Sequence, residues 1–228
     1  MSKKNKKINT LITQDQPKST ISEKFRSIRS NIMFSNANSE IKDILITSEK
    51  PGAGKSTIAA NVAITYAQAG YKVLIIDGDM RKPSLHYIFN ETNQQGLSNL
   101  IIGRVMDYDA IKPTEINNLD LLTSGPVPPN PSELIGSKKF SALYQRMTEK
   151  YDFIVIDTPP VTTVTDAQIY ARTVENIVLV VDVEKNDKNE IKKAKKLIEN
   201  TGNHVLGVVL NKTKPTKSSS YYYYYGEE

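Results

Sequence analysis

Short runs of apolar residues recur along the chain, and stretches with helical periodicity separate them. Most of these runs are continuously apolar rather than alternating, which is typical of parallel strands covered by helices on both faces. We predict strands over residues 43–47, 72–77, 119–123, 153–157, 176–182 and 204–211.

The segments between these runs have the spacing of helices. Helices are predicted over residues 55–69, 132–150, 166–173 and 188–200, and a further helix over about 22–34 precedes the first strand. Regular alternation of strands and helices implies βαβ units and a parallel sheet. We therefore predict an α/β fold of three layers, in which a mostly parallel sheet is flanked by helices on both sides.

The two ends of the chain differ from this body in composition. Residues 1–20 are rich in Lys, Asn, Ser and Thr and have few large apolar side chains, so we expect a flexible basic arm. Residues 21–212 make up the predicted folded domain. Residues 213–228 form a low-complexity segment without a core-forming pattern, and we call this segment the tail.

Composition narrows the classes of function. The chain has no cysteine, which excludes disulfides, thiolate metal sites and cysteine nucleophiles. Thirty Lys and Arg against 25 Asp and Glu give a net charge of +5, which suits an anionic ligand without indicating nucleic acid. No apolar run reaches the roughly 18–20 residues that span a bilayer, and no signal peptide is evident. We expect a soluble cytoplasmic protein.

The first predicted strand runs into the sequence SEKPGAGKST and then into a helix, which is the context of a phosphate-binding loop. Glycine allows backbone N–H groups to face a phosphate, and the helix N-terminus favours an anion. A glycine turn that merely caps a helix is the alternative, and both flanks argue against it. The residues expected to bind the nucleotide are Lys50, Gly52, Ala53, Gly54, Lys55, Ser56, Thr57 and Asn211.

Three carboxylates follow buried strands. Asp77 and Asp79 are two residues apart in VLIIDGDMR, so both can face the crevice where open α/β sheets bind ligands. Asp157 ends FIVIDTPP in the manner of a Walker B aspartate, which holds Mg²⁺. Aspartates at such positions also cap helices and turns, but three of them beside a phosphate loop favour a metal site. We expect Mg²⁺ to be held by Ser56, Asp77, Asp79 and Asp157.

The last predicted strand bears on the identity of the base. Guanine-specific relatives use N-K-x-D, whereas this chain has Asn211, Lys212, Thr213 and then Lys214 in place of the aspartate. ATP is therefore expected rather than GTP. Asn211 either bonds the adenine edge or is a turn residue at a strand end, and the sequence favours neither.

The phosphate loop departs from the usual pattern at one position. Glu49 stands where G-x-x-x-x-G-K-[ST] requires glycine, and Lys50 precedes the two glycines. The tighter string K-P-G-A-G-K-S resembles the deviant Walker A loop of the ParA/MinD class of P-loop ATPases. The resemblance implies a P-loop NTPase fold of the ParA/MinD type.

Further strings make the resemblance more specific. They are D-x-D-x-R at 77–81, D-T-P-P at 157–160, E-x-x-R-x-x-R at 23–29, GPVPPNPSELI at 125–135 and five consecutive tyrosines near the end. Together they resemble the bacterial tyrosine kinases over residues 20–228, in the cytoplasmic form found in Gram-positive bacteria. Members of that family regulate capsule and exopolysaccharide synthesis.

The resemblance implies how such a protein assembles and what it modifies. It implies ATP and Mg²⁺ as cofactors, protein-tyrosine substrates that include the chain itself, and a separate transmembrane activator of the polysaccharide co-polymerase type that recruits the protein to the inner face of the membrane. It implies a ring-shaped homo-oligomer built through Glu23, Arg26 and Arg29, although these residues also fit a solvated helix face. It implies phosphorylation of Tyr221, Tyr222, Tyr223, Tyr224 and Tyr225, which otherwise read as a low-complexity segment.

The expected mechanism is phosphoryl transfer to tyrosine. Lys55 and Mg²⁺ neutralise charge on the transferred group, and a carboxylate accepts the proton of the tyrosine hydroxyl. We favour Asp79 as that acceptor and place Asp77 nearer the metal. The main alternative is a ParA/MinD-type positioning ATPase without kinase activity, which needs a C-terminal amphipathic helix or a basic DNA-binding face. A scaffold that keeps ATP only for assembly is a second alternative.

Overall fold

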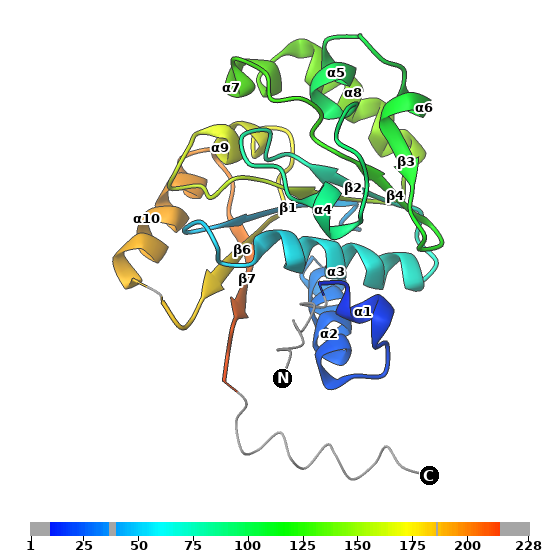
Figure 1. Cartoon of the computed structure of the whole chain (residues 1–228). Coiled ribbons are helices and arrows are strands. Elements are labelled where there is room, and N and C mark those ends of the chain that lie inside the picture. The colour runs from blue at the N-terminus through cyan, green and yellow to red at the C-terminus, as the bar shows by residue number, and fades with distance from the viewer. Residues whose placement is uncertain (1–9, 37–39, 186, 215–228) are drawn as a thin grey trace, which may run out of the picture.

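A seven-stranded sheet forms the centre of the protein (Figure 1). The computed structural model describes residues 10–36, 40–185 and 187–214. The strands lie in the order β3-β4-β2-β5-β1-β6-β7, in which β3 pairs antiparallel with β4 and all other pairs are parallel. Their bounds are β1 Asp43–Ser48, β2 Val73–Asp77, β3 Ile111–Pro113, β4 Leu119–Leu122, β5 Phe153–Asp157, β6 Ile177–Asp182 and β7 Val205–Asn211.

Helices cover both faces of this sheet, which confirms the predicted three-layer class. Neighbouring residues of one strand face opposite cores: Ile44 and Ile46 pack in the core with α2 and α3, and Leu45 packs in the core with α8, α9 and α10. Among the described residues, no helix is long and apolar enough to cross a membrane. The helices are α1 Ile12–Asp15, α2 Thr20–Phe34, α3 Lys55–Gln68, α4 Leu85–Ile88, α5 Leu97–Ile101, α6 Asp107–Ala110, α7 Pro131–Ile135, α8 Lys138–Lys150, α9 Asp166–Tyr170 and α10 Lys188–Glu199.

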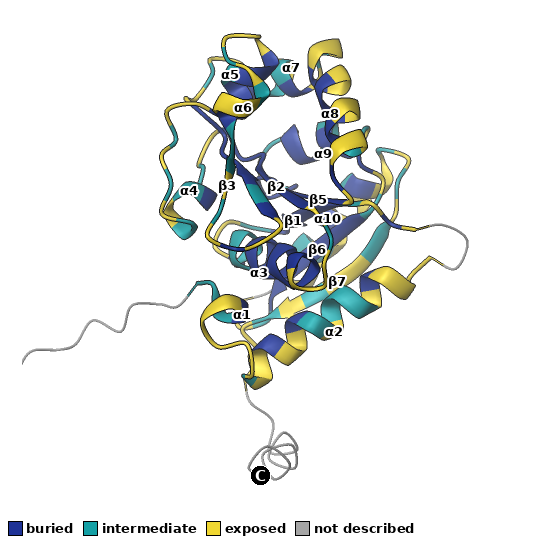
Figure 2. Ribbon diagram, turned by 90° about the vertical axis from the view of Figure 1, so that its right-hand side faces the viewer, coloured by how far each residue is buried: buried dark blue, intermediate teal, exposed yellow. Residues whose placement is uncertain are grey.

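The N-terminal segment covers the outer side of α3. Figure 2 shows α3 buried along most of its length, with α1 and α2 beside it. Thr13 is buried, and its N–H and hydroxyl both donate to Asn61 Oδ1, at 3.0 and 2.8 Å. The expectation of a flexible arm over 1–20 is therefore wrong for residues 10–20, because they cap the apolar outer face of α3. Residues 1–9 lie outside the described residues.

The predicted helix over 132–150 is two helices. α7 ends at Ile135, and Ser137 begins α8 because its hydroxyl accepts the N–H of Phe140. The short elements α1, β3, α4, α5 and α6 were not predicted, since none of them forms a continuous apolar run like the other strands or part of a longer stretch with helical spacing. The six predicted strands match β1, β2, β4, β5, β6 and β7 within one residue at each end.

Candidate active site

The strand order gathers the predicted site residues at one edge of the sheet. β5 lies between β2 and β1, and Asp157 is in register with Asp77 on one side and with Ile46 on the other. The loops that follow β1, β2 and β5 therefore leave the sheet side by side, as the crevice of an open α/β sheet requires. Segments separated by up to about a hundred residues in sequence meet at this edge.

The phosphate loop has the backbone of an anion cradle. Gly52 and Gly54 have φ of +76° and +93°, a region that glycine adopts without strain, and Gly54 is the N-cap of α3. A Cβ at Gly54 would lie 2.2 Å from Asn211 Nδ2, so only glycine fits there. The following residues, Lys55, Ser56 and Thr57, form the first turn of α3, where free N–H groups favour phosphate.

Asn211 and Lys212 form hydrogen bonds to the backbone of the phosphate loop. Asn211 Nδ2 donates to the carbonyl of Ala53 at 2.8 Å, and Lys212 Nζ donates to the carbonyl of Gly52 at 2.8 Å. Asn211 therefore has a structural role at the end of β7, in addition to its predicted role toward adenine. The N-K string positions the phosphate loop.

Glu49 explains the departure from the usual loop pattern. Its side chain is buried, and Oε1 accepts the backbone N–H of Asp182 at the end of β6. Lys50 Nζ lies 3.8 Å from Glu49 Oε1 and 3.9 Å from Asp182 Oδ2, and it donates to the carbonyl of Lys185. Asp182 also pairs with Lys212 at 2.8 Å. Lys50 is thus held at the rim of the loop by two carboxylates.

Lys55 lies between two carboxylates. Its Nζ is 3.3 Å from Asp79 Oδ2 and 3.4 Å from Asp157 Oδ1. Burial alone would lower the pKa of Lys55, but attraction to Asp157, Asp79 and Asp77 outweighs burial and raises it. The ammonium is therefore charged at neutral pH and is placed to share its charge between these carboxylates and a phosphate.

Asp77 has a different environment from Asp79. It is fully buried, its Oδ2 accepts the N–H groups of Ser84 and Leu85 at 2.9 Å each, and its Oδ1 accepts the N–H of Asp79 at 3.2 Å. Burial, followed by repulsion from Asp157, raises the pKa of Asp77 to about 7. The carboxylate of Asp77 therefore caps α4.

Ser84 is a site residue that the sequence did not reveal. Its hydroxyl donates to Ser56 Oγ at 2.8 Å, and its backbone N–H donates to Asp77. Ser84 thus connects the predicted metal-binding hydroxyl to the strand that carries the two aspartates. No signal in the sequence marks it, because a serine after Lys-Pro is an ordinary loop residue.

Arg81 ties the site to the helices above it. Its Nε and Nη2 contact the two carboxylate oxygens of buried Asp166 at 2.8 and 3.1 Å, and Nη2 also donates to Ser132 Oγ at 3.0 Å. Ser132 Oγ in turn donates to Asp166 Oδ1 at 2.6 Å. A bidentate pair of this kind fixes the orientation of the guanidinium and also contributes to stability. The D-x-D-x-R string is therefore joined rigidly to α7 and α9.

The residues present fit a magnesium nucleotide. Within residues 10–36, 40–185 and 187–214, no group of three or more His, Asp or Glu side chains is placed to hold a metal by itself. Mg²⁺ usually keeps several waters and binds one or two carboxylates together with substrate phosphates. The Ser56 hydroxyl, the Asp157 carboxylate and the glycine cradle supply that incomplete set.

The remaining predicted residues lie away from this crevice. Glu23, Arg26 and Arg29 are on α2, where Arg26 pairs with Glu23 and donates to the carbonyl of Pro17 at 2.7 Å. Arg29 donates to the carbonyl of Thr65 on α3. Their role between subunits stays a prediction. The predicted phosphorylation sites, 221–225, lie outside the described residues.

Known proteins resemble this chain along its whole length. The putative tyrosine-protein kinase CapB of Staphylococcus aureus is 64% identical over 228 residues, which is all of both chains. The tyrosine-protein kinase YwqD of Bacillus subtilis is 41% identical over 211 residues, or 92% of this chain and 89% of the relative. The crystal structure of the chimerical protein CapA2B2 matches with a TM-score of 0.89 and 59% identity, over 92% of each chain.

The wider fold family is shown as well. A family model described as ParA, NUBPL iron-transfer P-loop NTPase, matches residues 40–225. MinD of Pyrococcus horikoshii, solved with Mg-ADP, matches with a TM-score of 0.65 and 27% identity over 77% of this chain and 72% of that one. The predicted fold class and family resemblance are confirmed. The chain belongs to the bacterial tyrosine kinases, which are P-loop NTPases of the ParA/MinD type.

Proposed function

We propose that this chain transfers the γ-phosphoryl group of ATP to tyrosine hydroxyls, including the five tail tyrosines of another copy of itself. The observation that carries the proposal is the position of Lys55 between Asp79 and Asp157 at the phosphate loop. Similarity to two proteins named as tyrosine-protein kinases supports this chemistry over that of a positioning ATPase.

The nucleotide site uses this chain's own groups in separate roles. The N–H groups of the phosphate loop and the first turn of α3 bind the phosphates, and Lys55 neutralises charge on the β and γ groups. Ser56 and Asp157 would hold or orient Mg²⁺, which would neutralise charge on the phosphates. The Mg-ADP bound to a relative of the same fold supports this choice of ligand.

Proton transfer is assigned to Asp79. The bond between tyrosine oxygen and phosphorus forms as the bond to the ADP oxygen breaks, and the hydroxyl proton leaves to a carboxylate. Asp77 is engaged by three backbone N–H groups, whereas Asp79 Oδ2 faces Lys55. Asp77 therefore positions α4 and Ser84. Asp79 accepts a single backbone N–H, that of Lys82 at 3.0 Å, and its Oδ2 faces the crevice, so Asp79 is assigned the proton.

The assembly follows from the same proposal. The chain forms a ring-shaped homo-oligomer through α2, acts in the cytoplasm in capsule or exopolysaccharide synthesis, and is brought to the inner membrane face by a separate transmembrane activator. The name of the chimerical protein CapA2B2, which joins two components, supports an activator of this kind. No nucleic acid is expected as a partner.

Incubation with Mg-ATP tests the proposal. A Lys55→Met copy with an intact tail is mixed with an active copy whose five tail tyrosines are changed to Ser. Mass spectrometry of the Lys55→Met tail should show phosphotyrosine, because only the active copy can supply it. An unmodified tail, with and without the cytoplasmic segment of the activator, would show that transfer between copies is wrong.

A further inference from the structure

A groove whose exposed surface is mostly apolar lies beside the active site, outside the residues assigned a role so far. It has a volume of about 570 Å³ and lies between the segment after β4 and the helices α5 and α7. Two of its residues are unusually exposed for apolar side chains, Val127 at 62% and Ile102 at 40%. Its apolar lining consists of Ile102, Pro126, Val127, Pro128, Pro129 and Leu134.

Hydrogen bonds hold the walls of the groove, and one wall is joined to the loop after β2. Glu133 lines the groove, and its neighbour Ser132 accepts a hydrogen bond from Arg81, two residues after Asp79. On the opposite wall, Ser98 Oγ donates to the carbonyl of Pro126 at 2.8 Å. The groove is therefore preformed and adjoins the loop that carries the proposed base.

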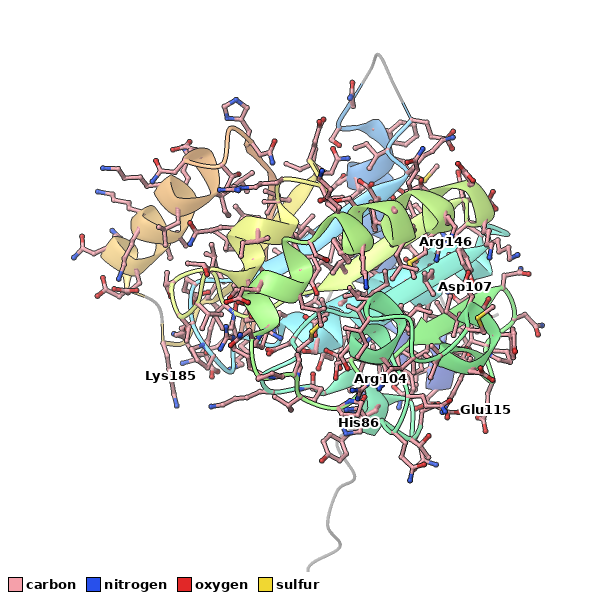
Figure 3. All side chains as sticks on the ribbon, turned by 90° about the horizontal axis from the view of Figure 1, so that it is seen from above. His86, Arg104, Asp107, Glu115, Arg146 and Lys185 are labelled. Atoms are coloured by element: carbon pink, nitrogen blue, oxygen red, sulfur yellow. The ribbon has the colours of Figure 1, made fainter. Side chains whose placement is uncertain are left out.

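Two cations border the groove. Arg104, labelled in Figure 3, and Lys139 are both exposed, and neither side chain has an ion pair or hydrogen bond with another part of the described chain. The acidic residue of the lining, Glu133, accepts a hydrogen bond from Asn130 at 3.3 Å. An apolar floor with a net positive rim suits a ligand that is aromatic and acidic.

The tail has this composition. Residues 221–228 read YYYYYGEE, so five aromatic rings are followed by two carboxylates. Tyrosine supplies apolar area with a polar end, and Glu pairs with Arg or Lys. The seven residue steps from 221 to 228 span at most about 23–25 Å when extended. One end of this segment can therefore occupy the groove while a tyrosine at its other end extends toward the loop after β2.

We infer that the groove bordered by Arg104 and Lys139 docks the end of the tail, residues 221–228, of a second copy of this chain. The inference rests on the proposed transfer of phosphate between copies and names the surface that selects the tail. Figure 1 shows the described chain ending below the sheet after β7, whereas α5 and α7 lie at the top. Lys212, near that end, donates to the carbonyl of Gly52 in the phosphate loop, and the proposed transfer between copies assigns the groove to the tail of a second copy.

A charge reversal in the mixed assay tests the docking. The active copy, with its tail tyrosines changed to Ser, additionally carries Arg104→Glu and Lys139→Glu. At acceptor concentrations below KM, the initial rate of phosphorylation of the Lys55→Met acceptor should fall about tenfold, since two attractive pairs become repulsive. An acceptor with Glu227→Lys and Glu228→Lys should restore the rate. Lys192→Glu with Lys196→Glu, the same charge change on exposed α10 positions, should leave it unchanged.

The outcomes separate the docking from the kinase proposal. If the Arg104→Glu, Lys139→Glu copy phosphorylates the acceptor at the unaltered rate, docking in the groove is wrong. It is also wrong if the rate falls and the acceptor with Glu227→Lys and Glu228→Lys does not restore it. If in that case the charge-reversed active copy also elutes at a different volume in size-exclusion chromatography, the groove forms contacts between folded domains instead. If the active copy with an unaltered groove leaves the acceptor unmodified, the proposed transfer itself is wrong.

Discussion

Lys55 neutralises two carboxylates in this structure and is expected to neutralise phosphate during the reaction. Replacement by Met keeps the side-chain length but removes the charge. We expect phosphotyrosine formation to fall by about 100-fold or more, in line with the loss of a preorganised electrostatic contact. The fold should be retained, because Lys55 faces the crevice rather than a hydrophobic core. Phosphotyrosine immunoblotting with circular dichroism as a control measures both effects, and normal autophosphorylation would contradict the assignment.

Asp77 gives a pH-dependent contribution to stability. Its folded pKa of about 7 lies above the ordinary value of 3.8, so the folded protein holds a proton that the unfolded chain releases. The stabilisation is complete below the unfolded pKa and is lost as pH rises toward 7, at no more than about 1.4 kcal/mol per pH unit. Between pH 5 and pH 7, the free energy of unfolding should therefore fall less steeply in the Asp77→Asn variant than in the unaltered protein. Denaturant titrations of both nucleotide-free proteins measure this free energy at each pH. If it falls equally with pH in the two proteins, the raised pKa of Asp77 is wrong.

At the scale of elements, α2 carries residues with unequal roles. Glu23 has an exposed side chain and a surface ion pair with Arg26, whereas Arg29 reaches the carbonyl of Thr65 on α3. Exposed ion pairs contribute about 0–1 kcal/mol, and hydrogen bonds to charged groups about 1.5–3 kcal/mol. The two ends of the E-x-x-R-x-x-R string therefore have separable effects.

Single replacements test that difference. Glu23→Ala should weaken the oligomer without changing the midpoint of thermal unfolding, while Arg29→Ala should lower that midpoint by loosening α2 from α3. Size-exclusion chromatography and thermal melts of the same samples measure the two effects. The triple replacement of Glu23, Arg26 and Arg29 by Ala should weaken assembly and leave Mg-ADP binding intact. An unchanged elution volume would mean that the motif is a solvated face.

At the scale of the whole molecule, the tail changes its charge during the reaction. Each phosphotyrosine adds about −1.5 to −2 charges at neutral pH, so five add roughly −8 to −10. Such a tail is repelled by the crevice carboxylates and by other tails in a ring. We expect the oligomer to dissociate as phosphorylation proceeds, which light scattering with parallel mass spectrometry can follow. An oligomer of constant mass at full phosphorylation would rule out this repulsion.

The predicted site was only partly defined by local sequence. The three aspartates were recognised individually, but the sequence placed Asp77 nearer the metal, and the structure shows it capping α4. That cap depends on a loop that folds back, with Ser84 seven residues after Asp77. Arg81 was recognised as part of a string, whereas its partner Asp166 is 85 residues away and had no mark of its own.

The sequence by itself determined the phosphate loop, the main strands and helices, and the family, because each depends on residues that are contiguous or regularly spaced. Only the tertiary structure decided which ends of the strands meet. Lys55 and Asp157 are 102 residues apart and lie within 3.4 Å because β5 inserts between β2 and β1. The same holds for the packing of residues 10–20 on α3, the support of the loop by Asn211, and the groove beside α7. Contacts of this kind depend on long-range strand order, which local patterns of polarity do not encode.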